Sequence, residues 1–285
     1  VAMHGSRRVG FGFLGFIAIC VLIGAGSARA ESCGELVTLS GHDGVELRYS
    51  LAGPAAGARA ALVLLPGGSG FIKLDGDGCP RKLKGNSLIR SCPLFHDGGM
   101  VTALLDAPSD HHGGEGLGGF RIDAAHAEDI GRVIADLRKR TGLPVWVVGT
   151  SRGGISAANA ASRLSGAEAP DGVVMTSPVT SGKIGVAKPW VADTVFSLPL
   201  ENIRMPVLVV VHADDQCVRT PPGLASDITD KTNSSREQVV RVTGGPGSGG
   251  GDSLAACKGK SPHGFLDQEA EVAAGIVRFV LGGAY

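Results

Sequence analysis

The sequence predicts an α/β protein with a mostly parallel central sheet and helices on both faces. Short apolar runs of strand length alternate with stretches of helical periodicity from about residue 45 to the C-terminus. Glycine is abundant, at 45 of the 285 residues, and it permits the tight turns and close helix–sheet packing of such folds. No repeat or linker interrupts the alternation, so we expect a single domain over residues 31–285.

The expected strands differ in how their apolar residues are arranged. Residues 45–51 alternate between apolar and mostly polar side chains, which indicates a strand with one buried face. Continuous apolar runs are typical of strands covered on both faces. Such runs occupy residues 60–65, 100–105, 144–148, 173–176 and 206–211, and a further strand is expected at 237–242.

Helices are expected between these strands. Residues 121–140 carry apolar side chains at helical spacing, and Gly142 and Pro144 end that helix. Three other segments are compatible with helices, at 86–95, 152–164 and 266–281.

The first thirty residues have the features of a secretory signal peptide. Arg7 and Arg8 precede an uncharged run, and the Ala-Arg-Ala sequence at 28–30 matches a cleavage site. An uncleaved membrane anchor is the alternative, because the run is about long enough to span a bilayer. The glycines in the run and its Ala-x-Ala ending favour cleavage. We therefore expect a signal peptide at 1–30 and a periplasmic or secreted mature chain without a membrane anchor.

The charge balance and the motifs exclude several classes of partner. The 27 Lys and Arg residues equal the 27 Asp and Glu residues, so no basic field favours nucleic acid. A GxGxxG match at 10–15 lies within the predicted signal peptide and follows no strand. The segment from Asp106 to His112 holds two Asp and two His after an expected strand. We expect this segment to line the substrate cleft, and metal binding by it is the alternative. For the protein as a whole we expect no cofactor and no metal.

Residues 149–153 read GTSRG and match the nucleophile-elbow pattern G-x-S-x-G. An apolar strand precedes the motif and a helical stretch follows it, which is the context that the pattern requires. Gly149 and Gly153 let neighbouring backbone pass without a Cβ clash. We expect Ser151 to be the nucleophile, and the alternative is a serine that caps a helix.

A serine nucleophile needs a base and an acid that orients the base. His263 is the only histidine after residue 212, and it precedes the last expected helix. The sequence His-Ala-Asp-Asp at 212–215 ends an expected strand, where catalytic groups collect in parallel sheets. We expect Asp215 to be the acid, with Asp214 as the alternative and Asp193 as a distant one.

The oxyanion of the reaction needs hydrogen-bond donors that are in place before it forms. The backbone N–H of Arg152, directly after the expected nucleophile, is one candidate donor. Gly68 or Ser69, in the Pro-Gly-Gly-Ser-Gly segment after an early strand, is the expected source of the other. A plain glycine turn is the alternative for this segment.

Export implies that the cysteines pair. Removal of the signal peptide leaves an odd number of them, which leaves one unpaired within the chain. We expect a Cys217–Cys257 bridge, because it would tie the expected acid loop to the expected base loop. We also expect a Cys79–Cys92 bridge, although sequence alone does not determine connectivity.

With the elbow, HADDQC at 212–217 and SPHGF at 261–265, the mature chain resembles the α/β-hydrolase superfamily over essentially its whole length. It resembles most the small secreted bacterial members with little or no lid. The resemblance implies an eight-stranded, mostly parallel sheet and a triad of Ser151, Asp215 and His263. It also implies acyl transfer to water through a covalent acyl-enzyme.

A small-molecule carboxylic ester is the expected substrate. A thioesterase or small-peptide hydrolase would use the same triad, and a non-catalytic binding protein or a structural envelope protein could have the same fold. An intact triad with an elbow argues against the last two classes, because neither role requires all three residues.

Overall fold

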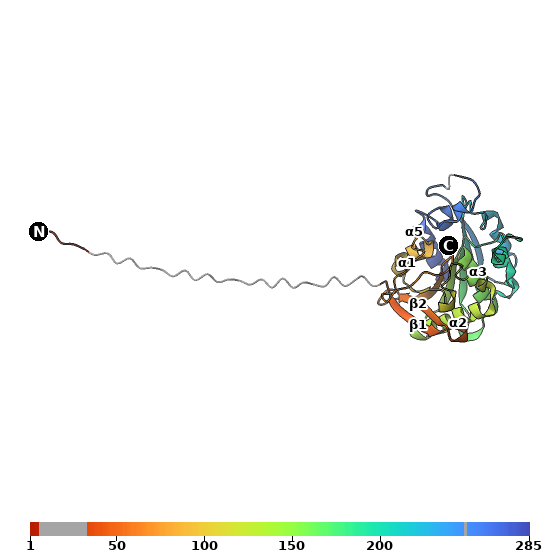
Figure 1. The fold of residues 1–285 in the computed structure, drawn as a ribbon, viewed down its shortest axis with the longest axis horizontal. Coiled ribbons are helices and arrows are strands. Elements are labelled where there is room, and N and C mark those ends of the chain that lie inside the picture. The colour runs from red at the N-terminus through yellow and green to blue at the C-terminus, as the bar shows by residue number, and fades with distance from the viewer. Residues whose placement is uncertain (6–32, 248–249) are drawn as a thin grey trace. The chain divides into compact units, whose positions relative to one another are not determined.

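Eight strands form one sheet in the order β1-β2-β4-β3-β5-β6-β7-β8. Its first two strands lie side by side (Figure 1). β1 pairs antiparallel with β2 and β2 pairs antiparallel with β4, whereas all the other pairs are parallel. The strands are β1 (Glu35–Ser40), β2 (Glu46–Ala52), β3 (Ala60–Leu65), β4 (Met100–Leu105), β5 (Val145–Thr150), β6 (Gly172–Thr176), β7 (Val207–His212) and β8 (Glu237–Val242).

The computed structural model describes residues 1–5, 33–247 and 250–285. The predicted signal peptide lies outside the described residues from residue 6 onward. Residues 32–285 form one unit of the chain, and residues 1–31 belong to another. None of the helices in the described part of the chain is long and apolar enough to span a bilayer.

Helices cover both faces of the sheet. The longer ones are α1 (Ser87–Asp97), α2 (Ala124–Thr141), α3 (Arg152–Arg163) and α5 (Glu269–Val280), and α4 (Ser226–Thr229) is a single turn. α2 and α3 pack on one face, and α1 and α5 pack on the other. Alternate residues of β3 therefore enter two different cores. Ala61, Val63 and Leu65 face α2 and α3, whereas Ala60, Leu62 and Leu64 face α1 and α5. This double burial explains the continuous apolar runs of the parallel strands. The predicted fold class is confirmed.

Helix ends follow ordinary capping chemistry. The Asp123 side chain accepts the N–H of Ala125 at the start of α2, and Gly142 adopts a left-handed conformation at its end. α3 begins directly after Ser151, so the end of β5 and the first turn of α3 together position the GTSRG motif.

Two disulfides connect loops, and one of them differs from the prediction. Cys217 is bonded to Cys257, and Cys33 is bonded to Cys79. We call these the acid-loop bridge and the amino-terminal bridge. The predicted Cys79–Cys92 pair is wrong. The backbone N–H of Cys33 donates to Asp77 O (3.0 Å), which brings Cys33 beside Cys79, with 4.9 Å between their Cα atoms.

Cys92 remains a thiol because it lies within α1, on the side that packs on the core. Its Sγ lies 3.4 Å from the carbonyl oxygen of Leu88 one turn earlier. Burial raises the pKa of this thiol to about 12, so it stays protonated at neutral pH.

Candidate active site

Ser151 lies on a sharp turn between β5 and α3. Its backbone has φ 54° and ψ −122°, a conformation that L-residues rarely adopt and that is associated with functional sites. The turn is held by hydrogen bonds from Ser151 N to Thr176 O (2.9 Å) and from Gly154 N to Ser151 O (2.9 Å). The serine is therefore fixed in a strained geometry at the carboxyl end of a central strand.

The two flanking glycines are required by backbone contacts rather than by flexibility. A Cβ on Gly149 would lie 2.1 Å from Gly153 O, and a Cβ on Gly153 would lie 1.9 Å from Leu65 O. Both distances are far below van der Waals contact, so no side chain fits at either position. The turn between β5 and α3 thus packs directly on the end of β3.

The glycine-rich segment after β3 passes beside Ser151. A Cβ on Gly67 would lie 2.9 Å from the Cβ of Ser151 and 3.6 Å from the backbone nitrogen of Arg152. Gly68 has φ +60° and a hydrogen bond from Gly70 N to Gly67 O (3.1 Å) closes the turn. The segment that holds Gly68 and Ser69 therefore lies against the nucleophile turn, as oxyanion donors would require. Arg152 is the first residue of α3, so its N–H has no carbonyl one turn earlier in the helix to bond.

Two buried side chains hold this segment in place. Asp106, at the end of β4, accepts the backbone N–H groups of Ile72 (2.8 Å) and Leu74 (2.9 Å). Arg121 donates to Pro66 O (3.0 Å) and to Ser156 Oγ (2.7 Å) on α3. Arg121 therefore holds the start of the predicted oxyanion segment (residues 66–70), and Asp106 holds the backbone shortly after it.

Asp215 and His263 form a hydrogen-bonded pair. The Nδ1 of His263 lies 3.0 Å from Oδ2 of Asp215, and both side chains are buried. Asp215 also accepts the hydroxyl of Thr220 (2.8 Å, at Oδ2) and the N–H of Cys217 (2.9 Å, at Oδ1). Because Nδ1–H donates to the carboxylate, Nε2 keeps its lone pair and can accept a proton.

The other acids considered from sequence lie elsewhere. Asp214 is exposed, and its backbone N–H donates to Nδ1 of His212 (3.0 Å), which in turn contacts Gly244 O through Nε2 (2.9 Å). His212 therefore shapes the turn after β7. Asp193 lies beside Arg219, which donates to its backbone carbonyl (3.3 Å). Only Asp215 among the three is hydrogen-bonded to His263.

The base and nucleophile line one open cleft of about 300 Å³. Ser151, Gly67 and Gly68 line this cleft together with His263 and its neighbouring loop. The structure thus brings four predicted positions to one cleft. Ser151, Gly68 and His263 line it directly, and Asp215 is connected to it through its hydrogen bond to His263.

The loop that carries His263 is positioned by contacts that sequence reasoning missed. Arg90, on α1, donates to Gly259 O (2.9 Å) and Gly264 O (2.8 Å), and pairs with Glu269 (2.6 Å) at the start of α5. No local motif marks Arg90, because its partners are more than 160 positions away. Sequence reasoning also missed Thr220, whose hydroxyl contacts both members of the acid–base pair.

The acid-loop bridge joins the two loops that carry this pair. Cys217 is two residues after Asp215, and Ser253 N donates to Gln216 O (2.9 Å) in the same region. Cys257 and Lys258 line the cleft beside His263. The disulfide therefore links the acid loop covalently to the base loop and restrains their relative movement.

A cationic side chain lies near the nucleophile turn. The guanidinium of Arg152 lies 4.0 Å from the centre of the Trp190 ring. Burial, together with the charge of Arg219, lowers the pKa of Arg152 to about 10, so the guanidinium remains protonated at neutral pH.

Comparisons with known proteins identify the fold. No protein-family model matches the chain, and no curated protein sequence matches it significantly. Solved structures do. A dienelactone hydrolase from Anabaena variabilis superposes with a TM-score of 0.57 at 17% identity, covering 88% of this chain and 97% of that chain. A monoacylglycerol lipase from Paleococcus ferrophilus gives 0.53 at 16% identity (82% and 98%). DcsB, solved with a substrate analogue, gives 0.60 at 15% identity (88% and 99%).

The chain therefore has the α/β-hydrolase fold. The resemblance inferred from the GTSRG, HADDQC and SPHGF segments is confirmed at the level of this fold.

Proposed function

We propose that this protein is an exported serine hydrolase that cleaves carboxylic esters with Ser151, His263 and Asp215. One observation carries the proposal: a serine on a strained strand-to-helix turn and a buried His–Asp pair line the same cleft. Neither a helix cap nor a structural turn requires a hydrogen-bonded acid–base pair on the opposite wall. The two disulfides agree with an oxidising compartment.

The reaction follows from the roles that the geometry permits. Nε2 of His263 takes the proton of the Ser151 hydroxyl as Oγ bonds to the ester carbonyl carbon, and Asp215 stabilises the imidazolium. The backbone N–H groups of Arg152 and of Gly68 or Ser69 stabilise the oxyanion. His263 then protonates the leaving alkoxide, and the C–O bond breaks to give the acyl-enzyme. Water, deprotonated by His263, releases the acid and restores Ser151.

Support for an ester rather than another acyl compound comes from the neighbours of the fold. Two of the similar structures are named for the hydrolysis of a lactone and of a monoacylglycerol, both of which are esters. The cleft is open rather than covered, which suits small or accessible substrates. A thioesterase or small-peptide hydrolase remains the alternative within the same mechanism.

A fluorophosphonate probe tests the proposal. The protein should be labelled once per chain, and Ser151→Ala should lose both the label and the hydrolysis of short-chain nitrophenyl esters. Ser165→Ala is the control, because this serine is exposed beyond the end of α3 and its side chain caps no helix. If the folded wild type is not labelled, the protein is a binding module rather than a serine hydrolase. A panel of esters, thioesters and aminoacyl amides then separates the enzymatic alternatives.

A further inference from the structure

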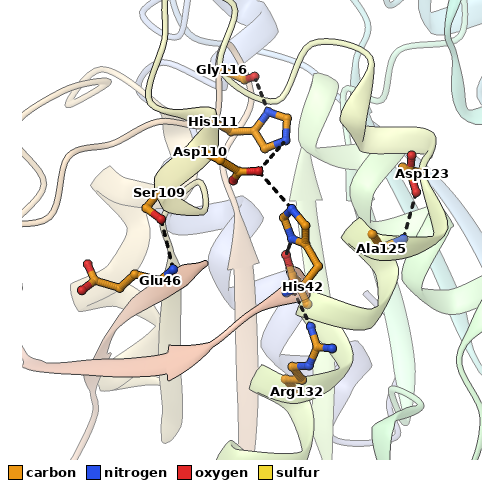
Figure 2. A network of polar contacts seen from close by, with 10 residues as sticks. His42, Glu46, Ser109, Asp110, His111, Gly116, Asp123, Ala125 and Arg132 are labelled. Atoms are coloured by element: carbon orange, nitrogen blue, oxygen red, sulfur yellow. Dashed lines mark hydrogen bonds and ion pairs between the residues drawn. The ribbon is translucent and has the colours of Figure 1, made fainter. Parts of the chain in front are cut away.

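A second cluster of ligand-type side chains lies apart from the triad, where two loops meet (Figure 2). His42 begins the one-turn helix His42–Gly44 between β1 and β2. Asp110 and His111 lie in the one-turn helix Ser109–His111 after β4. The cluster therefore joins segments that are almost seventy positions apart in the sequence.

The donor atoms converge. Nε2 of His42 lies 3.0 Å from Oδ2 of Asp110, and Nε2 of His111 lies 3.8 Å from the same oxygen. One ligand-type atom of each of the three residues lies within 4.8 Å of the other two. Ligands of a tetrahedral ion with bonds of 2.0–2.1 Å stand about 3.3 Å apart. A small adjustment of side chains would therefore place the three atoms around one ion.

Both imidazoles are oriented by a contact of their Nδ1 atoms, as the second ring nitrogen of metal-binding histidines commonly is. Nδ1 of His42 lies 2.7 Å from Oδ2 of Asp129, a buried carboxylate on α2, and Nδ1 of His111 lies 3.1 Å from Gly116 O (Figure 2). A carbonyl only accepts, so Nδ1 of His111 carries the hydrogen, and the same assignment for His42 satisfies Asp129. Nε2 of His42 donates to Oδ2 of Asp110 when no ion is bound. An ion would replace this proton, and the Nε2 lone pairs of both rings would then face the ion.

Asp129 is itself held in place, which makes it a rigid support. Its Oδ1 accepts the backbone N–H of His42 (2.7 Å) and a bond from Arg132 (2.7 Å). The ring of Phe120 stacks on that of His111, with 4.1 Å between the ring centroids, and its centroid lies 4.8 Å from that of His42. Phe120 therefore covers both imidazoles on one side. The outer side is open, because the side chain of Asp110 is 41% exposed. An ion can enter from solvent while the two rings stay fixed.

We propose that His42, Asp110 and His111 bind a Zn²⁺ ion, with water in the fourth position. Two imidazole nitrogens and one carboxylate oxygen form an established tetrahedral set for zinc, whereas Mg²⁺ and Ca²⁺ prefer oxygen ligands. The proposal takes up metal binding, which the sequence analysis gave as the alternative for the segment from Asp106 to His112. It is independent of the proposed esterase function, because none of its residues belongs to the triad.

The ion would clamp the β1–β2 turn to the loop after β4. That loop continues to Leu117, whose N–H donates to Ser69 O (2.8 Å) in the oxyanion segment. Zinc is thus expected to fix a loop that contacts the active-site scaffold, in addition to raising the stability of the whole fold by mass action.

Zinc titration of the untagged protein by calorimetry, with both disulfides intact, tests the site. The wild type should bind one Zn²⁺ per chain. His111→Ala and Asp110→Asn should each weaken binding at least tenfold, since even the loss of an outer hydrogen bond to a ligand weakens zinc affinity 10–100-fold. These two positions are chosen because their side chains are partly exposed, whereas His42→Ala would remove the imidazole partner of Oδ2 of the buried Asp129. His112→Ala is the matched control, because it removes the adjacent histidine outside the cluster.

Co²⁺ supplies a second readout that does not depend on activity. Bound at this site it should give the visible absorption of a tetrahedral ion, which the Asp110 and His111 variants lose and the His112 variant keeps. The proposal is overturned if the wild type takes up no stoichiometric Zn²⁺, or if the Asp110 and His111 variants, shown by circular dichroism to be folded, bind it as tightly as the wild type. Either result would leave His42 as a purely structural partner of Asp110 and Asp129. Labelling of Ser151 by the fluorophosphonate would be unaffected by that outcome.

Discussion

Asp215→Asn is the substitution that most directly tests the acid–base pair. The carboxylate has two different surroundings: Oδ1 accepts the backbone N–H of Cys217, and Oδ2 faces Thr220 and His263. An asparagine keeps the shape, but its amide oxygen must stay on the Oδ1 side, since a backbone N–H donates there. The NH₂ group then faces Nδ1 of His263 and donates to it.

This reversal moves the imidazole proton to the wrong nitrogen. With Nδ1 as an acceptor, neutral His263 carries its hydrogen on Nε2 and cannot take the proton of Ser151. The same exchange in the triad of a serine protease lowers kcat about 10⁴-fold, which corresponds to about 5 kcal/mol in the activation free energy. Because a hydrogen bond to the imidazole is kept, we expect the fold and the KM to change little.

The assay is steady-state hydrolysis of a short-chain nitrophenyl ester, with Asp214→Asn as the matched control. Asp214 is the adjacent acid, and its side chain is exposed, so its variant should keep kcat within about threefold of the wild type. A folded Asp215→Asn protein with wild-type kcat would refute the assigned role of this pair. A large loss in Asp214→Asn alone would transfer the role to Asp214.

Two further predictions concern stability and its coupling to catalysis. Replacing both cysteines of the acid-loop bridge by serine should lower the free energy of unfolding by about 4 kcal/mol for a loop of 40 residues, and should also lower kcat. Removing the amino-terminal bridge, which closes a loop of 46 residues, should lower the free energy of unfolding in urea by a similar amount but leave kcat unchanged. If the loss of either bridge changes kcat equally, the acid-loop bridge has no specific effect on catalysis. Burial and the charge of Arg121 lower the pKa of His126 well below 6.5, so its contribution to stability is present above pH 6.5 and is lost as the pH falls. Between pH 7.5 and 5.5 the wild type should therefore lose about 1.4 kcal/mol more than His126→Gln, and identical pH profiles would contradict a buried neutral imidazole.

The central part of the fold could be predicted because its strands are buried on both faces. Such strands are apolar at nearly every position, and the resulting runs at 60–65 and 100–105 coincide with β3 and β4. β1 was missed because it is an edge strand with only Val37 fully buried. An edge strand needs few apolar residues, so its sequence does not differ from that of a loop.

The residues of the candidate site also differ in whether the sequence could predict them. Ser151 and His263 could be proposed from sequence because local motifs and position mark them. Arg90 and Thr220 could not, because each acts through hydrogen bonds between segments that are brought together only by the fold. The predicted Cys79–Cys92 pair failed for the same reason, since a backbone hydrogen bond from Cys33 to Asp77 helps to bring Cys33 beside Cys79, whereas the predicted Cys217–Cys257 pair is present.

Asp106 is a buried acid that we expect to affect catalysis without contacting the substrate. Its Oδ1 accepts the N–H groups of Ile72 and Ala107, and its Oδ2 accepts that of Leu74. Asp106→Asn replaces one acceptor by an NH₂ group, which must face a backbone donor. The loss of a charge-assisted bond and the unpaired N–H should together lower the free energy of unfolding by about 2–4 kcal/mol.

The same substitution should also lower kcat, because the segment that Asp106 supports continues into Gly68 and Ser69, the expected oxyanion donors. Donors displaced by a fraction of an ångström stabilise the oxyanion less, whereas ground-state binding of a small ester changes less. Urea unfolding and nitrophenyl ester kinetics measure the two effects, with Asp230→Asn, an exposed acid after α4, as the control. A variant that loses stability at unchanged kcat would mean that the hydrogen bonds of Asp106 stabilise the fold but do not position the oxyanion donors.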